Sequence, residues 1–246
     1  MSAVNSQNSI QPGARRPIIA IDGPAGAGKS TVARHLARYF GLLNLETGAM
    51  YRAFAFKALA AGVNLDDAGG LVKLSAGTSI TLEPTEQGNR VLLDGADVTT
   101  QLREPAVTDG ASRVSVHPAI RSWMVRLQQE LGAAGGVVME GRDIGTVVFP
   151  RAELKIFLEA SQEVRAERRW KEHQEKGETL TLAQVLEEVR ERDRRDRERK
   201  VSPLMRASDA VLVDNTAMDV EETARLVVML AREREKELAK AAGRED

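Results

Sequence analysis

The chain has 246 residues and a formal net charge of −1, with 29% of its residues charged. This length suits one domain with insertions or two small domains, and the balanced charge gives no global basic field of the kind that favours nucleic acid as a partner. The absence of cysteine excludes a disulfide framework, a thiol nucleophile and a zinc–thiolate site.

Two further exclusions concern membranes and export. No apolar stretch approaches the ~20 residues that a membrane-spanning helix needs. Residues 1–16 lack the continuous apolar core of a signal peptide, so we expect a disordered lead-in there. The sequence therefore predicts a cytoplasmic protein that binds neither membranes nor nucleic acids, and we expect a monomer.

The first predicted strand, Ile18–Ile21, is followed by GPAGAGKS at residues 23–30 and by a helical pattern over Thr31–Phe40. The run fits G-x-x-x-x-G-K-[ST], in which backbone N–H groups cradle phosphates, Lys29 reaches the β- and γ-phosphates and the Ser30 hydroxyl ligates Mg²⁺. The helix N-terminus adds partial positive charge. The alternative is a glycine-rich turn that binds nothing. We predict an ATP site formed by Gly23, Pro24, Ala25, Gly26, Ala27, Gly28, Lys29, Ser30 and Thr31.

The second predicted strand, Leu42–Leu45, leads into Glu46-Thr47-Gly48 and a predicted helix over Ala49–Leu59. Gly48 permits a tight turn between them. Arg52 lies in the first part of the helix, where its guanidinium can pair with a phosphate.

Between about Gly62 and Gln101 the pattern changes. Ser79–Leu82 and Arg90–Leu93 alternate apolar and polar residues, and Asp94-Gly95 is a turn signal. This pattern predicts a small antiparallel insertion on the side of the site where a phosphate acceptor would bind. The alternative is an insertion at the protein surface that contacts no ligand.

The rest of the chain alternates predicted strands with predicted helices, which indicates an α/β fold with a five-stranded parallel sheet. Ligands then bind beyond the carboxyl ends of the strands. The remaining strands are Val137–Met139, Leu154–Leu158 and Ala210–Val213, and the helices are Ala119–Leu131, Gln162–Glu175, Leu182–Lys200 and Val220–Leu238.

Glu140-Gly141-Arg142-Asp143 follows the third of the parallel strands and opens onto the same sheet edge as the glycine-rich loop. An arginine and a carboxylate placed there can hold a small polar ligand, although a loop-stabilising ion pair is an equal alternative. Together with the phosphate loop, the cluster indicates a kinase whose acceptor itself carries a phosphate.

A charge-dense run covers Glu187–Lys200. Its plain interpretation is a solvated helix with i,i+4 ion pairs. The spacing also places Arg192, Asp196 and Arg199 on one helical face, where guanidinium groups can stabilise the charge of a transferring phosphoryl group. Lys176-Gly177 and Ser202-Pro203 then serve as hinges of a closing flap.

As a whole the sequence resembles the bacterial cytidylate kinases, on IDGPAGAGKST, TGAMYR, EGRDIGTVVFP, KIFLEAS and RERDRRDRERKVSPL, over about residues 17–230. The resemblance implies a P-loop kinase that uses Mg²⁺ and transfers the γ-phosphoryl group of ATP to CMP or dCMP. It implies a single domain over residues 17–246: a core (17–61, 132–161 and 206–230), a monophosphate-binding insertion (62–131), a helical lid (162–205) and a charged C-terminal helix extension (231–246).

The resemblance also implies roles for individual residues. Arg52, Arg142 and Arg199 match residues that hold the acceptor phosphate, Arg192 a lid arginine near the transferred group, and Asp196 an aspartate near the ribose. Ser112, Arg121 and Asp143 match residues around the cytosine ring, and Thr47 belongs to the same CMP site. The implied catalytic residues are Lys29, Arg142, Arg192 and Arg199.

Two positions depart from the common pattern of that family. Glu46-Thr47 stands where Asp-Ser is usual, and Glu140 where Asp is frequent. Three alternatives remain: a P-loop kinase for another phosphorylated acceptor such as UMP, a non-catalytic nucleotide switch, and RNA binding by the arginine-rich helix. The sequence lacks the guanine-recognition pattern [NT]-K-x-D of GTPase switches, which argues against the switch. It also lacks aromatic stacking residues near the arginine-rich helix, which argues against RNA binding.

Overall fold

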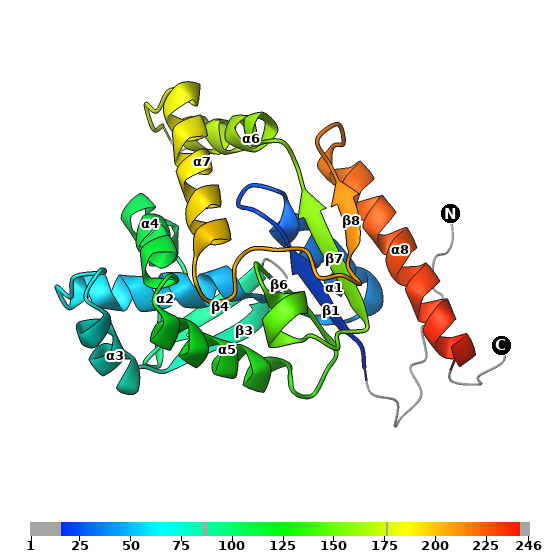
Figure 1. Cartoon of the computed structure of the whole chain (residues 1–246), viewed down its shortest axis with the longest axis horizontal. Helices are drawn as coiled ribbons and strands as arrows, with labels where there is room; N and C mark the ends of the chain where they lie inside the picture. The colour runs from blue at the N-terminus through cyan, green and yellow to red at the C-terminus, as the bar shows by residue number, and fades with distance from the viewer. Residues whose placement is uncertain (1–15, 86–87, 176, 242–246) are drawn as a thin grey trace.

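A five-stranded parallel sheet forms the centre of the computed structural model, which describes residues 16–85, 88–175 and 177–241 (Figure 1). The strand order is β2-β6-β1-β7-β8, and every pairing is parallel. The predicted α/β fold is thus confirmed. The strands are β1 (Ile18–Asp22), β2 (Leu43–Glu46), β6 (Val137–Gly141), β7 (Leu154–Glu159) and β8 (Val211–Asp214).

Helices cover both faces of the sheet because alternate residues of the central strand point to opposite sides. Ile18 and Ala20 of β1 belong to one apolar core, shared with α2 (Thr47–Ala60) and α5 (Pro118–Gly132). Ile19 and Ile21 belong to the other core, shared with α1 (Lys29–Phe40) and α8 (Val220–Ala241). The carboxyl ends of the strands are left open for ligands.

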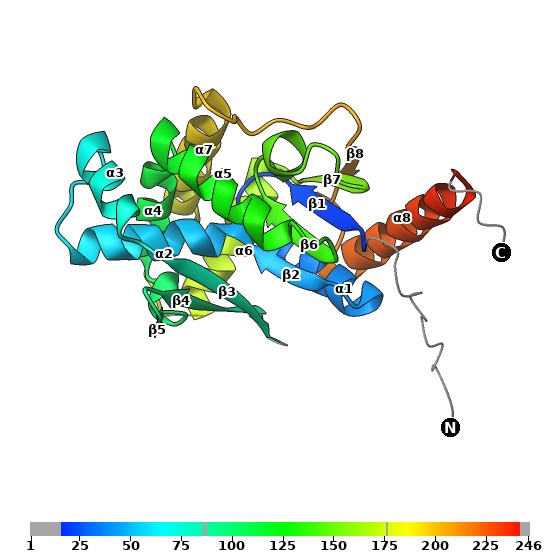
Figure 2. The same cartoon turned by 90° about the horizontal axis from the view of Figure 1, so that it is seen from below.

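The predicted antiparallel sheet in the insertion is also confirmed. It has the order β3-β4-β5, with β3 (Ile80–Thr85), β4 (Gly88–Leu93) and β5 (Ala96–Asp97). Asp94 (φ 51°) and Gly95 (φ 84°) form the tight two-residue turn between β4 and β5. The small sheet lies against α2, at the end of the molecule away from α8 (Figure 2).

Two helices in the insertion were not predicted: α3 (Ala68–Ala76) and α4 (Pro105–Val114). A 3₁₀ turn over Gln101–Arg103 precedes α4. The Asp67 carboxylate accepts a hydrogen bond from the Gly69 N–H at the start of α3 (3.0 Å), and α4 begins with a proline in its first turn, a favoured position. α4 packs along α2, which brings it to the edge of the ligand site.

The predicted lid segment, residues 162–205, which is called the lid below, contains α6 (Gln162–Glu175) and α7 (Leu182–Glu198), seen at the top of Figure 1. Both helices contribute to a small apolar cluster of Ala166, Val185 and Val189. Of the four predicted hinge residues, Gly177 and Ser202 have positive φ angles of 76° and 49°. Pro203 follows Ser202, and Lys176 lies outside the described residues.

The prediction that α7 extends to Lys200, with Arg199 on its face, is wrong. The helix ends at Glu198, and Arg199 has extended backbone angles (φ −60°, ψ 140°). The chain folds back there, since the Leu204 N–H donates to the Asp196 carbonyl at 2.7 Å and the Arg199 guanidinium donates to the Ser202 carbonyl at 2.5 Å. Arg199 therefore reaches the site from a turn rather than from a helical face.

Both chain ends extend beyond the described residues. Nearly all of the predicted disordered lead-in, residues 1–15, lies outside the described residues. The predicted C-terminal helix extension is present as the end of α8, up to Ala241, and residues 242–246 lie outside the described residues. Within the described ranges, no helix has both the length and the apolar character that crossing a membrane requires.

Candidate active site

The glycine-rich loop, residues 23–30, runs from the end of β1 to the start of α1. Gly23 sits so close to β7 that a Cβ atom there would lie 2.0 Å from the Leu158 carbonyl oxygen. Gly28 is left-handed (φ 87°), and among the described residues no side chain caps the helix that follows. The N–H groups of the first turn are therefore free to bind an anion, and the helix dipole favours one.

Lys29 is buried at the start of α1, and its Nζ donates to the Pro24 carbonyl at 2.7 Å, across the loop. Burial, and then the nearby Arg142 guanidinium, lower the pKa of Lys29. A phosphate placed in the loop would supply the negative charge that restores the protonated lysine.

Glu140 is the next-to-last residue of β6, at the carboxyl end of the strand, and lies directly opposite Glu46, which ends β2. Burial and the Glu46 carboxylate both raise the pKa of Glu140, whereas a hydrogen bond from the Ser30 hydroxyl and the positive charge of Lys29 lower it. Its Oε1 is buried and has no hydrogen-bond partner among the described residues. A carboxylate and a hydroxyl thus converge beside the loop with an acceptor oxygen still unused.

Asp22 connects the loop to the segment after β6. Its carboxylate accepts hydrogen bonds from the Ile144 N–H (2.8 Å) and the Gly145 N–H (2.7 Å), at the start of a π-helical turn over Ile144–Val148. Burial raises the pKa of Asp22 to about 6. Through these bonds the end of the central strand fixes the backbone that carries Asp143.

Thr47 and Gly141 bring the ends of β2 and β6 close together. The Thr47 hydroxyl donates to the Glu140 carbonyl at 2.7 Å. Gly141 has no room for a side chain, because a Cβ there would lie 2.9 Å from Thr47 Oγ1 and 2.7 Å from Ile144 Cδ1. The two acceptor-side segments singled out in the sequence are therefore packed against each other.

All eight residues predicted to bind CMP line one pocket, which we call the acceptor pocket; they are Thr47, Arg52, Ser112, Arg121, Arg142, Asp143, Asp196 and Arg199. Arg121 and Asp143 form an ion pair of 2.5 Å, and the Tyr51 ring lies 5.7 Å beneath the Arg121 guanidinium. Ser112 Oγ, Arg121 Nε and Asp143 Oδ2 are buried without hydrogen-bond partners among the described residues. The pocket thus presents both donors and acceptors that a polar ring can satisfy.

Arginines surround the junction between this pocket and the glycine-rich loop. Arg52, Arg142 and Arg192 line the acceptor pocket and also the cavity that contains Lys29 and Ser30. Burial and the Arg142 guanidinium lower the pKa of Arg192 to about 9, so the group keeps its charge at neutral pH. Such a concentration of positive charge is suited to holding two phosphate-bearing ligands at once.

Carboxylates hold three arginines of the acceptor pocket in place, Arg52, Arg142 and Arg199. Arg52 pairs with Glu46, six residues earlier in the chain. Asp196 on α7 accepts from Arg142 at 2.9 Å and pairs with Arg199 at 3.4 Å. The neighbouring Arg142, Arg192 and Arg199 guanidinium groups help to keep the pKa of the buried Asp196 below its usual value. The lid is therefore tied to the acceptor loop through Asp196.

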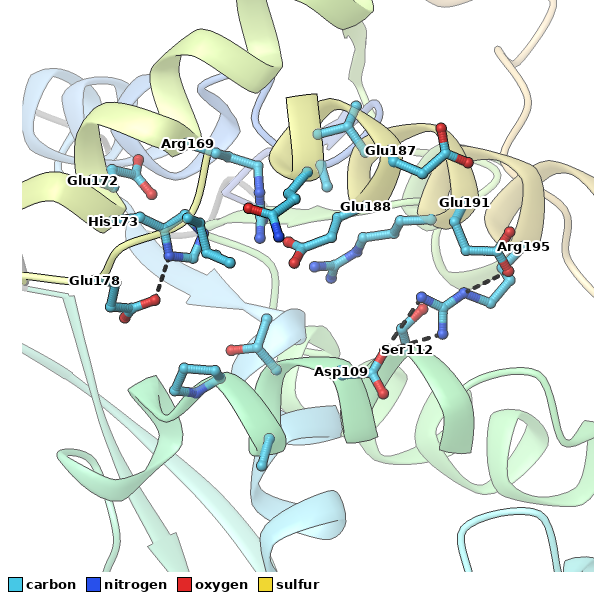
Figure 3. A pocket seen from close by; sticks show the side chains of 18 of the residues that line it. Asp109, Ser112, Arg169, Glu172, His173, Glu178, Glu187, Glu188, Glu191 and Arg195 are labelled. Atoms are coloured by element: carbon cyan, nitrogen blue, oxygen red, sulfur yellow. Dashed lines mark hydrogen bonds and ion pairs between the residues drawn. The ribbon is translucent and has the colours of Figure 1, made fainter. Parts of the chain in front are cut away.

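A cavity of about 810 Å³ separates the lid from α4 (Figure 3). Asp109 and Ser112 of α4 face Glu188, Glu191 and Arg195 of α7 across it, and one ion pair, Arg195–Asp109 at 3.2 Å, crosses the gap. Charged side chains and apolar residues such as Leu180 and Val189 both line it, and the lining includes Ala25 of the loop and Arg192. The cavity therefore extends from the outside of α4 and α7 to the glycine-rich loop.

The sequence predictions did not include several residues that build the site: Asp22, Tyr51, Asn89, Arg165, Arg169 and Asp193. Glu140 was noted only as a departure from a pattern. Asp22 and Glu140 could have been found, because each is a carboxylate at the carboxyl end of a continuous apolar strand. No group of three or more His, Asp or Glu side chains suited to a metal ion occurs in the part of the chain that the structure describes.

Comparisons with known proteins agree with this geometry. The family model described as cytidylate kinase matches residues 19–233. A cytidylate kinase of Pelotomaculum thermopropionicum is 52% identical over 213 residues, covering 86% of this chain and 94% of that protein. One of Geobacillus kaustophilus is 49% identical over 220 residues (89% and 98% covered), and one of Enterococcus faecalis is 50% identical over 204 residues (83% and 90% covered).

Proposed function

The chain belongs to the cytidylate kinase family, and from this premise we infer that it transfers the γ-phosphoryl group of ATP to CMP or dCMP, giving ADP and CDP or dCDP. It is an ATP-dependent nucleoside monophosphate kinase. The observation that carries the mechanism below is the set of three arginines, Arg52, Arg142 and Arg192, that line both the loop cavity and the acceptor pocket.

We propose that residues 23–31 bind the triphosphate of ATP. The uncapped N–H groups at the start of α1 support this role, as does the positive end of the helix dipole. Lys29, whose Nζ lies across the loop, is proposed to contact the β- and γ-phosphates.

We further propose that Mg²⁺ binds with ATP at Ser30, with Glu140 beside it. The donor set fits the ion, because Mg²⁺ prefers oxygen ligands and usually keeps several waters. The unpartnered, buried Oε1 of Glu140 is the specific observation in favour; it can accept a hydrogen bond from a metal-bound water. When bound, the ion neutralises charge on the β- and γ-phosphate oxygens.

The acceptor phosphate is proposed to lie among Arg52, Arg142 and Arg199. Their guanidinium groups can bind phosphate oxygens in pairs and reduce the repulsion between the monophosphate and the γ-phosphate. An ionised monophosphate is already a nucleophile, so the reaction needs no general base. Catalysis then consists of alignment of the two phosphates and stabilisation of the transferring group, to which Arg192 contributes from the lid.

The base is proposed to contact Ser112, Arg121 and Asp143. Cytosine offers an exocyclic amino donor and acceptors at its ring nitrogen and carbonyl. The hydroxyl and carboxylate can accept from the amino group, and the guanidinium can donate to the acceptors. Uracil reverses two of these positions and would leave buried groups unpaired, at a cost of about 1–3 kcal/mol each. The unpartnered atoms of these three residues support the assignment.

The ribose is proposed to lie near Asp196, and closure of the lid is proposed to keep water from the γ-phosphate. We propose that the enzyme acts in pyrimidine nucleotide metabolism in the cytoplasm, since both substrates are small soluble nucleotides. The family membership supports this placement.

A coupled assay with a panel of monophosphates tests the function. CMP and dCMP should give the highest kcat/KM, and UMP and AMP should each fall at least about 30-fold below CMP, because two or more unpaired buried groups would each cost about 1–3 kcal/mol. Equal or better use of UMP would contradict the cytosine assignment. Acceptor-independent ADP release at the same rate would contradict the kinase assignment itself.

A further inference from the structure

Two fully buried charged residues in the lid take no direct part in the mechanism above. Arg165 of α6 is 1% exposed and Asp193 of α7 is 2% exposed. Their side chains form a two-pronged ion pair, with Arg165 Nη1 at 2.9 Å from Asp193 Oδ1 and Nη2 at 2.6 Å from Oδ2. A buried pair of this kind contributes little net stability, since desolvation offsets its attraction, but it fixes geometry closely.

The same guanidinium reaches beyond the lid. Arg165 Nη1 also donates to the Ala25 carbonyl in the glycine-rich loop at 3.0 Å, and Nε donates to the Ala160 carbonyl after β7 at 2.9 Å. One side chain therefore joins the ATP-binding loop, the end of a core strand and the far helix of the lid. Gln162 of α6 also donates to Asp193 Oδ2 at 3.3 Å, and the small apolar cluster around Val185 and Val189 packs between the same two helices.

The position of Asp193 in the chain gives this link its consequence. Asp193 immediately follows Arg192, which lines the cavity containing Lys29 and Ser30. Because adjacent residues share one rigid turn of α7, the pair that anchors Asp193 also determines how far Arg192 lies from the loop. Arg194, the next residue, points to solvent, and within the described part of the chain its recorded partner is Glu191 at 2.5 Å.

We propose that Arg165 and Asp193 are positioning residues that register α7 against the ATP-binding loop, so that Arg192 meets the transferring phosphoryl group. This inference rests on the proposed phosphoryl transfer, though not on the identity of the acceptor base. In this proposal the Arg165–Asp193 ion pair attaches the lid to the glycine-rich loop. A change that displaces the pair therefore displaces Arg192 as well.

A double-mutant cycle on kcat tests the proposal, with Arg165→Lys and Arg192→Lys as the single variants. Arg165→Lys keeps the positive charge but cannot form both hydrogen bonds to the Asp193 carboxylate. We expect kcat to fall about 10- to 100-fold, as it does when a catalytic group is misplaced by about 1 Å. KM for CMP should stay within about twofold, since neither residue belongs to the proposed CMP set. In the Arg192→Lys background the same change should lower kcat by less than about twofold. Asp193→Glu, which moves the carboxylate by one methylene, should behave in the same way.

The matched control is Arg194→Lys, an exposed arginine on the same helix, which should leave kcat within about twofold of the wild type. Thermal unfolding of every variant reports folding separately. Equal losses of kcat in both backgrounds, no loss for Arg165→Lys, or no loss for Arg192→Lys alone would each overturn the proposal. It is also overturned if Arg165→Lys and Asp193→Glu are both unfolded at the assay temperature, because the pair is then a folding element.

Failure of the proposed function gives a different result. In that case the wild-type enzyme does not phosphorylate CMP or dCMP, whatever the variants do. The double-mutant cycle is then run with the monophosphate that the wild type does accept. Additive losses of kcat for Arg165→Lys and Arg192→Lys overturn the positioning proposal, and non-additive losses support it, whatever the acceptor is.

Discussion

Arg121 and Asp143 form an ion pair of 2.5 Å in which both side chains are almost fully buried, at 2% and 6% exposure. The exposed pair Arg113–Asp66 has the same length, with side chains 37% and 69% exposed. The two contacts thus have the same length and differ in burial. When the carboxylate of the buried pair is removed, water cannot solvate the arginine that remains. The loss of a carboxylate should therefore lower the unfolding free energy much more in the buried pair than in the exposed pair.

Asp143→Ala should reduce kcat/KM for CMP by about 100-fold or more, because the proposed contact to the base is lost and Arg121 is released. ATP hydrolysis without acceptor should change by less than about threefold, since the loop is untouched. The unfolding free energy should fall by about 3–5 kcal/mol. Steady-state kinetics and chemical denaturation measure these effects. Asp66→Ala, the matched control, should cost at most about 1 kcal/mol and leave kinetics unchanged; similar effects of the two substitutions would contradict the assignment.

Asp22 should make stability depend on pH. Burial raises the pKa of Asp22 to about 6, above its ordinary value of 3.8. The folded state therefore holds this proton more tightly than the unfolded state, so the contribution of Asp22 to stability is greatest below about pH 4 and declines as pH rises towards 6. Asp22→Asn removes the titration. The wild type minus variant difference in unfolding free energy should decline by about 2 kcal/mol from pH 4 to pH 7; a difference that rises with pH would contradict the sign.

Glu140→Gln should raise the Mg²⁺ concentration needed for half-maximal rate by about 10-fold, the lower end of what loss of a supporting carboxylate costs at metal sites. Rates measured against free Mg²⁺ at constant ATP give the value. Glu159→Gln is the matched control, because Glu159 also ends a parallel strand but is 41% exposed at its side chain. An unchanged Mg²⁺ dependence in Glu140→Gln would remove Glu140 from the proposed metal site.

The parts of this fold that sequence reasoning predicted are those with a local cause. Continuous apolar runs such as Ile18–Ile21 indicate strands covered on both faces, and Asp94-Gly95 indicates a tight turn. The insertion helices were missed because α3 contains Gly69-Gly70 and α4 contains Gly110, which weaken a helical pattern. Packing explains Gly110: a Cβ there would lie 3.2 Å from both Ala55 Cβ and Leu65 Cδ1, so a glycine lets α4 approach α2 closely.

The parts of the site that were missed have distant causes. Arg165 and Asp193 both stand in charge-rich helical runs, where the usual interpretation is a solvated face. Their pairing spans 28 residues and two helices, which no i,i+4 pattern contains. Whether a charged side chain points into the protein or into solvent depends on which elements pack against it. Those elements are distant in the sequence, so a local pattern does not reveal them.

Asn89 attaches the small antiparallel sheet of the insertion to the core. Its side-chain amide donates to the Asn44 carbonyl (2.7 Å) and accepts from the Glu46 N–H (2.8 Å), so it pairs with the edge strand β2 as a further strand would. Asn89→Ala leaves both backbone groups unpaired, and the unfolding free energy should fall by about 1–3 kcal/mol. KM for CMP should rise several-fold with little change in kcat, because Glu46 holds Arg52 against the acceptor pocket. Asn64→Ala, which removes an exposed hydrogen bond to the Asp66 N–H, is the control and should change neither quantity. A fall in kcat at unchanged KM would show that the hydrogen bonds of Asn89 to β2 affect the transfer step and not acceptor binding.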